Sequence, residues 1–189
     1  MIVHATTQDT EILMKYIAFL RAINVGGRRV KMDALRDIFM AINGLSQIET
    51  FIASGNVIFE SDIDPNILEP QIETVLNDKL GYIVETFIRT FDDLRHITQN
   101  IPFSDYNPDA DSLCIGFMRD TPSDEALTKL ATLTSDIDFF VVKRAELYWL
   151  CRKSISESKI SGNKIEKTLG MPATLRDIST IHKLLTKYA

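Results

Sequence analysis

The chain has 189 residues, a formal net charge of −5, 45% hydrophobic and 25% charged residues, and two cysteines. This composition is that of an ordinary globular protein and excludes a disordered or fibrous chain. Two cysteines are too few for a disulfide scaffold or a clustered zinc site, so we expect buried thiols, a reducing cytoplasmic location, no metal and no cofactor. No apolar run approaches the roughly 20 residues of a membrane-spanning helix, so no membrane association is expected.

Residues 1–13 precede the first strand-like run and have neither the cationic start nor the apolar centre of a secretory signal. We expect them to form a disordered extension. An N-terminal tail and an early start codon would both explain such a segment.

The first half of the chain alternates strand-like and helix-like patterns. Apolar runs indicate strands, apolar residues at helical spacing indicate helices, and Gly55-Asn56 indicates a hairpin turn, with a β-bulge as the alternative. In chain order the pattern predicts a strand at 15–20, a helix opened by Asp33 and ended by Asn43-Gly44, two strands within 48–61, a helix from Pro65 to Gly81 and a strand within 82–90. The order β-α-β-β-α-β is that of a ferredoxin-like, or alpha-beta plait, unit.

The second half repeats this order less completely. The pattern predicts a short helix at 91–101, a linker at 102–111, a strand at 112–118, a helix opened by Thr121-Pro122, a hairpin of 138–143 with 146–151, a helix ending at Leu169-Gly170 and a last helix opened by Thr174 and Asp177. No final strand is predicted. The expected fold is therefore α+β, with one ferredoxin-like unit at 14–101 and a second plait-like unit with C-terminal helices at 112–189.

The charge is distributed unevenly along the chain. Residues 1–140 hold 11 basic and 22 acidic residues, whereas residues 141–189 hold 10 basic and 4 acidic ones. Such polarity is typical of an anion-binding end, of complementary faces between domains or in a dimer, or of a solvated basic helix pair.

The loop after the first strand is the leading candidate for a binding site. No acidic residue occurs between Tyr16 and Met32, yet four basic residues do. Gly26-Gly27 can turn backbone N–H groups toward a ligand, and a helix start follows, which is the combination that binds phosphate or carboxylate. Neither GxxxxGK[ST] nor GxGxxG is present, so no known nucleotide-binding loop is indicated.

Other motifs carry less information. Two SxxK patterns, Ser156–Lys159 and Ser161–Lys164, lack the accompanying motifs of the Ser/Lys hydrolases. The three histidines are scattered, so neither a metal site nor a catalytic triad is indicated. Aromatic residues on central plait strands can bind RNA, but the acidic first half makes nucleic acid an unlikely ligand.

Three segments resemble one family of bacterial proteins, the domain of unknown function 1697 family. They are LRAINVGGRRVKM (20–32), SGNVIF (54–59) and the tail SK…LG-PATLRD-ST-HKL (158–184). The family pattern has glycine where this chain has Ala22, and tends to have Asn and Trp where Asp177 and Ile178 stand. The resemblance implies two ferredoxin-like units in tandem and no established activity.

These observations predict a cytoplasmic protein that binds a small anionic metabolite or nucleotide, with enzymatic activity left open. The expected ligand-binding residues are Arg21, Asn24, Gly26, Gly27 and Arg28 in the loop, with Lys159 and Arg176 from the basic tail. Two alternatives are an interaction or assembly module, for example in a homodimer, and an RNA-binding protein. No catalytic residue is predicted.

Overall fold

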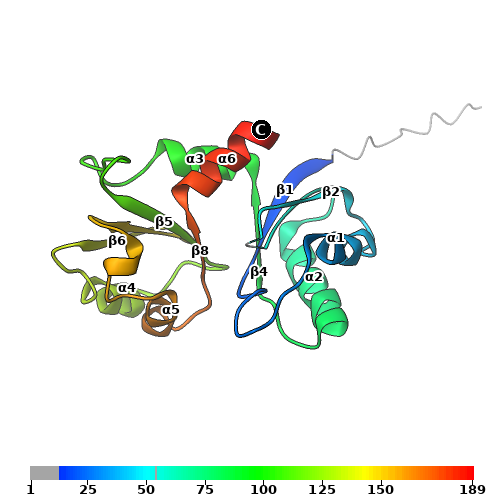
Figure 1. Ribbon diagram of the computed structural model, residues 1–189, viewed down its shortest axis with the longest axis horizontal. Helices are drawn as coiled ribbons and strands as arrows, with labels where there is room; N and C mark the ends of the chain where they lie inside the picture. The colour runs from blue at the N-terminus through cyan, green and yellow to red at the C-terminus, as the bar shows by residue number, and fades with distance from the viewer. Residues whose placement is uncertain (1–12, 54) are drawn as a thin grey trace, which may run out of the picture.

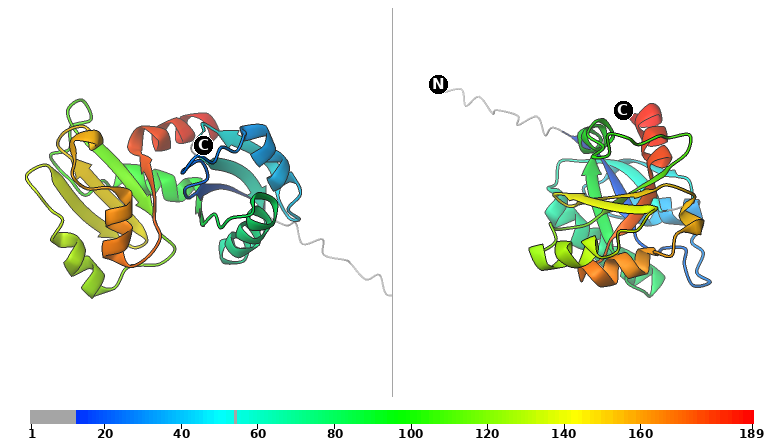
Figure 2. Two further views of the ribbon diagram at one scale, coloured as in Figure 1. Left: turned by 60° about the horizontal axis from the view of Figure 1, so that its bottom comes forward. Right: turned by 90° about the vertical axis from the view of Figure 1, so that its left-hand side faces the viewer.

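The computed structural model describes residues 13–53 and 55–189. Two four-stranded antiparallel sheets face each other, and six α-helices cover them (Figure 1). Helices α3 and α6 lie side by side along one edge of the molecule, beside the core that the two sheets share, and α4 and α5 lie side by side against the second sheet (Figure 2). The prediction of a disordered extension at 1–13 falls almost entirely outside the described residues.

The elements of the first half are β1 (Met14–Leu20), α1 (Met32–Met40), β2 (Ser46–Phe51), β3 (Asn56–Ser61), α2 (Pro65–Leu80), β4 (Thr86–Thr90) and α3 (Phe91–Gln99). Those of the second half are β5 (Ser112–Phe117), α4 (Asp124–Ala131), β6 (Asp138–Lys143), β7 (Glu146–Cys151), the short 3-10 helix η1 (Ile155–Glu157), α5 (Gly162–Leu169), β8 (Thr174–Asp177) and α6 (Ile178–Tyr188). The strand order is β2-β3-β1-β4 in one sheet and β6-β7-β5-β8 in the other.

Most of the predicted elements are found, and the α+β class is confirmed. The main correction concerns the end of the chain, where Thr174 does not open a helix but begins strand β8, antiparallel to β5. The last helix starts at Ile178, and the side chain of Asp177 accepts a hydrogen bond from the Ser179 N–H. A four-residue strand with a charged residue in its middle has too little β pattern to be recognised from sequence.

Two predicted helix starts are also displaced. Helix α1 begins at Met32 with Lys31 in the N-cap position, so Asp33 lies in the first turn and does not cap it. Helix α4 is capped by Ser123, whose hydroxyl accepts from the Ala126 N–H, and not by Thr121. Both are shifts of two residues, which is the usual uncertainty at helix ends.

Each sheet has one face covered by its own helices and one face turned toward the other sheet. In β1, Tyr16, Ala18 and Leu20 pack under α1 and α2, whereas Ile17 and Phe19 belong to a core shared with the second sheet. A strand buried on both faces reads as a continuous apolar run, which explains the pattern at 15–20. A third core lies between the second sheet and helices α4 and α5.

The shared core joins both halves of the chain. Its buried residues come from β1, β3 and β4, from β5 and β7, and from α3 and α6. At its centre the rings of Phe19 and Phe117 stack with centroids 4.1 Å apart and planes 11° apart. The two sheets are therefore packed through apolar side chains rather than joined only by the 102–111 segment.

Both cysteines, Cys114 and Cys151, are buried and free, as expected. Burial raises the pKa of the Cys114 thiol to about 12. Among the described residues, no helix is long and apolar enough to cross a membrane.

We predict that the Phe19–Phe117 stack couples the stabilities of the two halves. Phe19→Leu and Phe117→Leu should each cost about 1–2 kcal/mol of unfolding free energy, and their double-mutant cycle should show a coupling of about 0.5–1.5 kcal/mol. Urea unfolding measures all three variants. In the matched control cycle, Phe39→Leu in the core under α1 should combine additively with Phe117→Leu; equal coupling in both cycles would contradict a direct stack.

Candidate functional site

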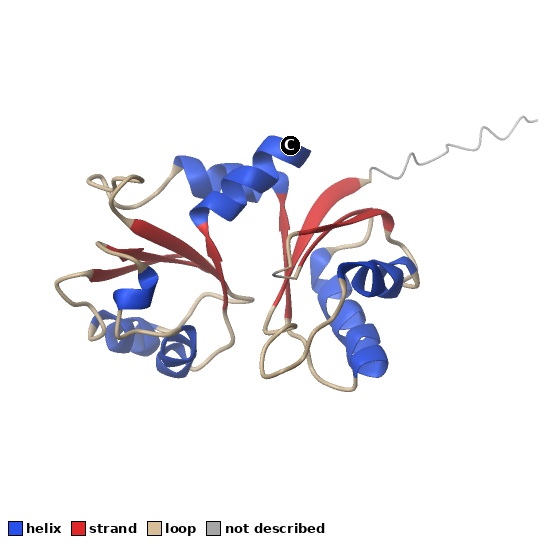
Figure 3. Cartoon of the chain, viewed as in Figure 1, coloured by secondary structure: helices blue, strands red, loops and turns tan. Residues whose placement is uncertain are grey.

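The Gly-Gly loop joins β1 to α1 at the end of the first sheet that lies away from α3 and α6 (Figure 3). Gly26 and Gly27 adopt φ angles of +70° and +82°, which glycine adopts without strain. The side chain of Asn24 braces the loop, because its amide donates to the Ala53 carbonyl at 2.8 Å and its oxygen accepts from the Val30 N–H at 2.8 Å. Asn24 thus holds the shape of the loop.

A surface hollow of about 490 Å³ lies against this loop and the start of α1. It is lined by Asn24, Gly27, Arg28, Arg29, Val30, Lys31, Met32 and Ala53. Three of these residues are cations and none is acidic. Lys31 makes no side-chain hydrogen bond that caps α1, so the first N–H groups of the helix are not satisfied by a capping side chain.

Arg28 is held beside this hollow by Tyr82. Its guanidinium carbon lies 4.1 Å from the centroid of the Tyr82 ring, and the Tyr82 hydroxyl donates to the Ile23 carbonyl at 3.0 Å. The side chain forms no ion pair with the described residues. Its charge therefore remains available to a ligand.

Arg21 lies next to the loop but is engaged elsewhere. It donates through Nη1 to Glu85 Oε2 at 2.7 Å, through Nη2 to Glu166 Oε2 at 2.7 Å, and through Nε to Glu166 Oε1. These hydrogen bonds, led by those to Glu166, raise the pKa of Arg21. The basic tail thus meets Arg21 through a carboxylate on α5, and Arg21 acts as a link between the two halves.

Arg176 is buried at the interface between the sheets, with 7% of its surface exposed. From β8 it donates to Asn56 Oδ1 at 2.7 Å and to the backbone carbonyls of Leu20 and Gly55 at 3.1 and 3.2 Å. Its guanidinium also lies 5.4 Å from the centroid of Phe19. Burial lowers its pKa to about 10. It does not line the hollow at the Gly-Gly loop.

Lys159 is also apart from the loop. It lines a different hollow of about 490 Å³, beside η1 and the turn before β6, together with acidic residues such as Asp136 and Glu157. The structure therefore brings together Asn24, Gly27 and Arg28 of the predicted set, with Gly26 in the same loop, but not Lys159 or Arg176.

Two further arginines cross between the halves and were not singled out from the sequence. Arg119, just after β5, donates to Glu69 and Glu73 of α2 at 3.0 and 2.6 Å. Arg89 of β4 donates to Glu146 at 2.8 Å and lies 5.5 Å from the centroid of Phe117. Only the three-dimensional fold pairs these residues, since each partner is at least 46 positions away in the chain.

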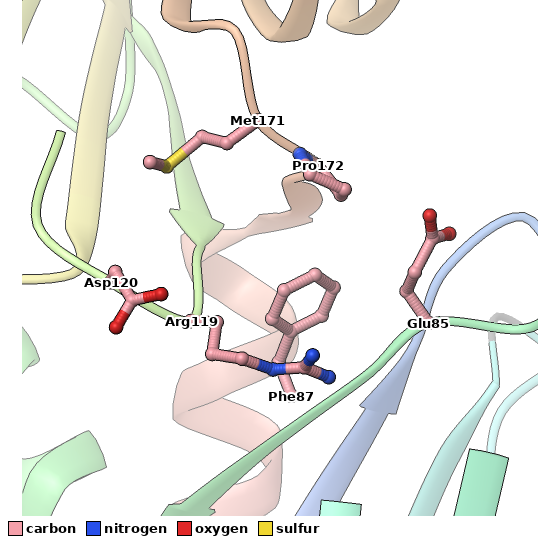
Figure 4. Close-up of a pocket in the computed structure, with 6 residues that line it drawn as sticks. All are labelled: Glu85, Phe87, Arg119, Asp120, Met171 and Pro172. Atoms are coloured by element: carbon pink, nitrogen blue, oxygen red, sulfur yellow. The ribbon is translucent and has the colours of Figure 1, made fainter. Parts of the chain in front are cut away.

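A smaller pocket of about 170 Å³ lies between the halves beside these contacts (Figure 4). Phe87, Met171 and Pro172 give it an apolar lining, and the charged residues Glu85, Arg119 and Asp120 complete it. Two of the three charged side chains are tied by the arginine contacts described above, because Glu85 accepts from Arg21 and Arg119 donates to α2. The pocket is lined by both acidic and basic side chains, so its charge does not indicate whether a ligand would be an anion or a cation.

A family model described as "Protein of unknown function (DUF1697)" matches residues 13–148. The chain belongs to the DUF1697 family. The matched range includes the motifs at 20–32 and 54–59, whereas the tail motif at 158–184 lies beyond it. Among curated proteins no match is found.

One solved structure resembles the chain over most of its length. It is described as "conserved bacterial protein SP0830 from Streptococcus pneumoniae", with 21% sequence identity and a TM-score of 0.72 over 93% of this chain and 98% of that one. At this identity the likeness shows the fold alone. Neither the DUF1697 family nor this structure assigns an activity.

The alanine that departs from the DUF1697 pattern has a strained backbone. Ala22 adopts a φ of +53°, in the left-handed region where glycine is favoured. We predict that Ala22→Gly raises the unfolding free energy by about 0.5–1 kcal/mol, because the relief of this strain exceeds the added chain entropy of glycine. Thermal and urea unfolding measure the change. The control Ala41→Gly, at an exposed position with a φ of −85°, should not stabilise the protein; a gain at both positions, or at neither, would contradict the strain argument.

We also predict that the contacts of Arg21 stabilise the fold. Arg21→Gln should lower the unfolding free energy by about 2 kcal/mol, because Glu166 and Glu85 lose charge-assisted hydrogen bonds. Urea unfolding of the variant tests this. The matched control Arg29→Gln, at an exposed residue without an ion pair among the described residues, should be nearly neutral. Equal stability of Arg21→Gln and the parent would show that the contacts contribute nothing.

Proposed function

We propose that the protein binds a small anionic metabolite or nucleotide in the hollow at the Gly-Gly loop. The observation that carries the proposal is the lining of this hollow, which contains Arg28, Arg29 and Lys31 and no acidic residue. A protein with a net charge of −5 attracts an anion only where its cations are concentrated and not neutralised.

The backbone around the hollow supports the same ligand class. Helix α1 starts at its edge, and the N-terminus of a helix presents N–H groups and a positive partial charge to an anion. A Cβ atom added at Gly26 or Gly27 would meet nothing within 4 Å, so the backbone there is open to close approach. The hollow is open and broad enough for a phosphate group with part of the molecule that carries it.

The proposed ligand set differs from the one predicted from sequence. Asn24, Gly26, Gly27 and Arg28 are retained, and Arg29 and Lys31 are added because they line the hollow. Arg21, Lys159 and Arg176 are assigned no ligand contact. Asn24 acts mainly by holding the loop, since both ends of its amide are hydrogen-bonded to the backbone.

We also propose that the chain consists of two ferredoxin-like units, that it is located in the cytoplasm and that it comes from a bacterium. Two ferredoxin-like units in tandem, at 14–101 and 112–189, are supported by the matching strand orders and by helix crossovers at matching places. A cytoplasmic location is supported by two free, buried thiols. A bacterial origin is supported by the structural likeness to a bacterial protein.

A second candidate, an interaction module, is favoured by one feature of the same region. Val25, Ile52 and Ile83 are 64%, 47% and 73% exposed in the loops after β1, β2 and α2. Exposed apolar side chains on neighbouring loops are typical of a protein-binding surface. If the purified protein is a monomer that shows no association at any salt concentration, the dimer version of this candidate is excluded.

We predict that a screen of nucleotides, phosphorylated metabolites and carboxylates by thermal shift will yield ligands of the Gly-Gly loop. Arg28→Gln and Lys31→Gln should each weaken such a ligand about tenfold by calorimetry, because each removes a charge-assisted hydrogen bond. The matched control Lys159→Gln removes a cation outside the hollow and should leave the affinity unchanged. If both loop variants bind every ligand as the parent does, the proposed site is wrong.

A further inference from the structure

A second cleft, separate from the Gly-Gly loop, lies between α3 and the β6–β7 hairpin. Its volume is about 150 Å³, well below the roughly 300–1,000 Å³ of pockets that hold drug-sized ligands. It is lined by Asp93, His96, Ile97, Lys143, Arg144, Glu146 and Tyr148. Six of these seven residues are polar or charged. The cleft therefore suits one small polar group.

The hydroxyl of a buried tyrosine reaches this cleft. Tyr148 is only 2% exposed, yet its hydroxyl forms no hydrogen bond with any described residue. Every fully buried polar side-chain atom of the described residues has a partner, so this hydroxyl is not sealed in the core and reaches the cleft. A phenol in this position favours a hydrogen-bond acceptor beside it.

The hydroxyl is fitted to act as a donor. Burial, with the Glu146 carboxylate adding to it, raises the pKa of Tyr148 to about 12. The group therefore stays protonated at neutral pH. A hydrogen-bond acceptor placed beside it would satisfy this donor, and an anionic oxygen is the strongest acceptor.

The two carboxylates of the cleft are already engaged by other groups. Asp93 Oδ2 accepts from the backbone N–H and the hydroxyl of Thr90, at 2.9 and 2.7 Å, as part of the cap of α3. Glu146 Oε1 accepts from Arg89 at 2.8 Å. Asp93 therefore helps to cap α3, and the charge of Glu146 is paired with that of Arg89.

The cations of the cleft are less engaged. Arg144 is exposed and makes no hydrogen bond or ion pair with any described residue. Among the described residues, Lys143 donates one side-chain hydrogen bond, from Nζ to the Asn100 carbonyl at 3.0 Å, and lies 6.0 Å from the centroid of the Tyr148 ring. His96 contributes a ring from the last turn of α3. The Tyr148 hydroxyl and the Arg144 guanidinium are therefore donors of the cleft without a partner among the described residues, and Lys143 is only partly engaged.

We propose that this cleft binds a small oxyanion, a phosphate or a carboxylate group, through the Tyr148 hydroxyl, Arg144 and Lys143. The hydroxyl supplies a directed hydrogen bond from the floor, and the two cations on the hairpin supply charge from the rim. His96 closes the side formed by α3. This proposal does not rest on the Gly-Gly loop. It would stand even if the loop bound no ligand.

Titration of the full-length protein with inorganic phosphate and, separately, with acetate tests the proposal by amide NMR. Saturable shifts are expected for residues of the β6–β7 hairpin and the last turn of α3. Stronger binding of phosphate assigns a phosphorylated ligand, and stronger binding of acetate assigns a carboxylate. If neither anion gives saturable shifts in these segments at millimolar concentrations, the proposal is wrong.

Two variants locate the binding groups without endangering the fold. Tyr148→Phe removes only the hydroxyl, and Arg144→Gly removes the cation at a position with a φ of +56°, where glycine is the relaxed residue. Each should weaken binding about tenfold, as expected for the loss of a hydrogen bond to a charged group.

Two control variants separate this site from others. Tyr16→Phe alters another buried tyrosine, and Arg28→Gln alters the Gly-Gly loop; both should leave the affinity at the cleft unchanged. If Tyr148→Phe binds as tightly as the parent, or if Arg28→Gln removes the shifts, the cleft is not the binding site.

Discussion

The shared apolar core between the two sheets is the constraint on which the rest of the structure depends. Each sheet has a second apolar face that its own helices do not cover, and these faces bury each other around the stacked rings of Phe19 and Phe117. One arginine from each sheet lies over the stacked phenylalanine of the other sheet. Arg89 reaches from the first sheet over Phe117, and Arg176 reaches from the second sheet over Phe19. The core thus brings charged side chains to its edges.

This arrangement explains why basic residues near the Gly-Gly loop divide into two groups. Arg21 and Arg119 each follow the first strand of their half and donate to carboxylates on a helix of the other half, Glu166 on α5 and Glu69 on α2. A cation already bound to carboxylates has little charge left for a ligand. Arg28, a few residues farther along the loop, forms no ion pair with any described residue and lies over the Tyr82 ring. The position of an arginine relative to the interface between the sheets, and not its residue type, therefore decides whether it pairs with carboxylates or stays open to a ligand.

The sequence predicted the parts of the fold that have strong local patterns. The double-sided burial of β1, the β6–β7 hairpin and the Gly81 helix end follow from apolar runs and turn residues. It missed β8, because four residues carry little periodicity and the strand exists only through pairing with β5. The residues that the sequence suggests for a binding site illustrate the same limit. The loop is local, whereas the partners of Arg21 and Arg176 are 145 and 120 positions away.

The two candidate binding places share a property that separates them from the interface. At the interface, donors and acceptors are matched, as the contacts of Arg119 with Glu69 and Glu73 illustrate. The Gly-Gly hollow and the α3–hairpin cleft are both lined by cations that form no ion pair with the described residues. These cations are exposed, so water solvates them when no ligand is bound. A cation that no carboxylate pairs keeps its charge for an anion, which is why both proposals name an anionic ligand.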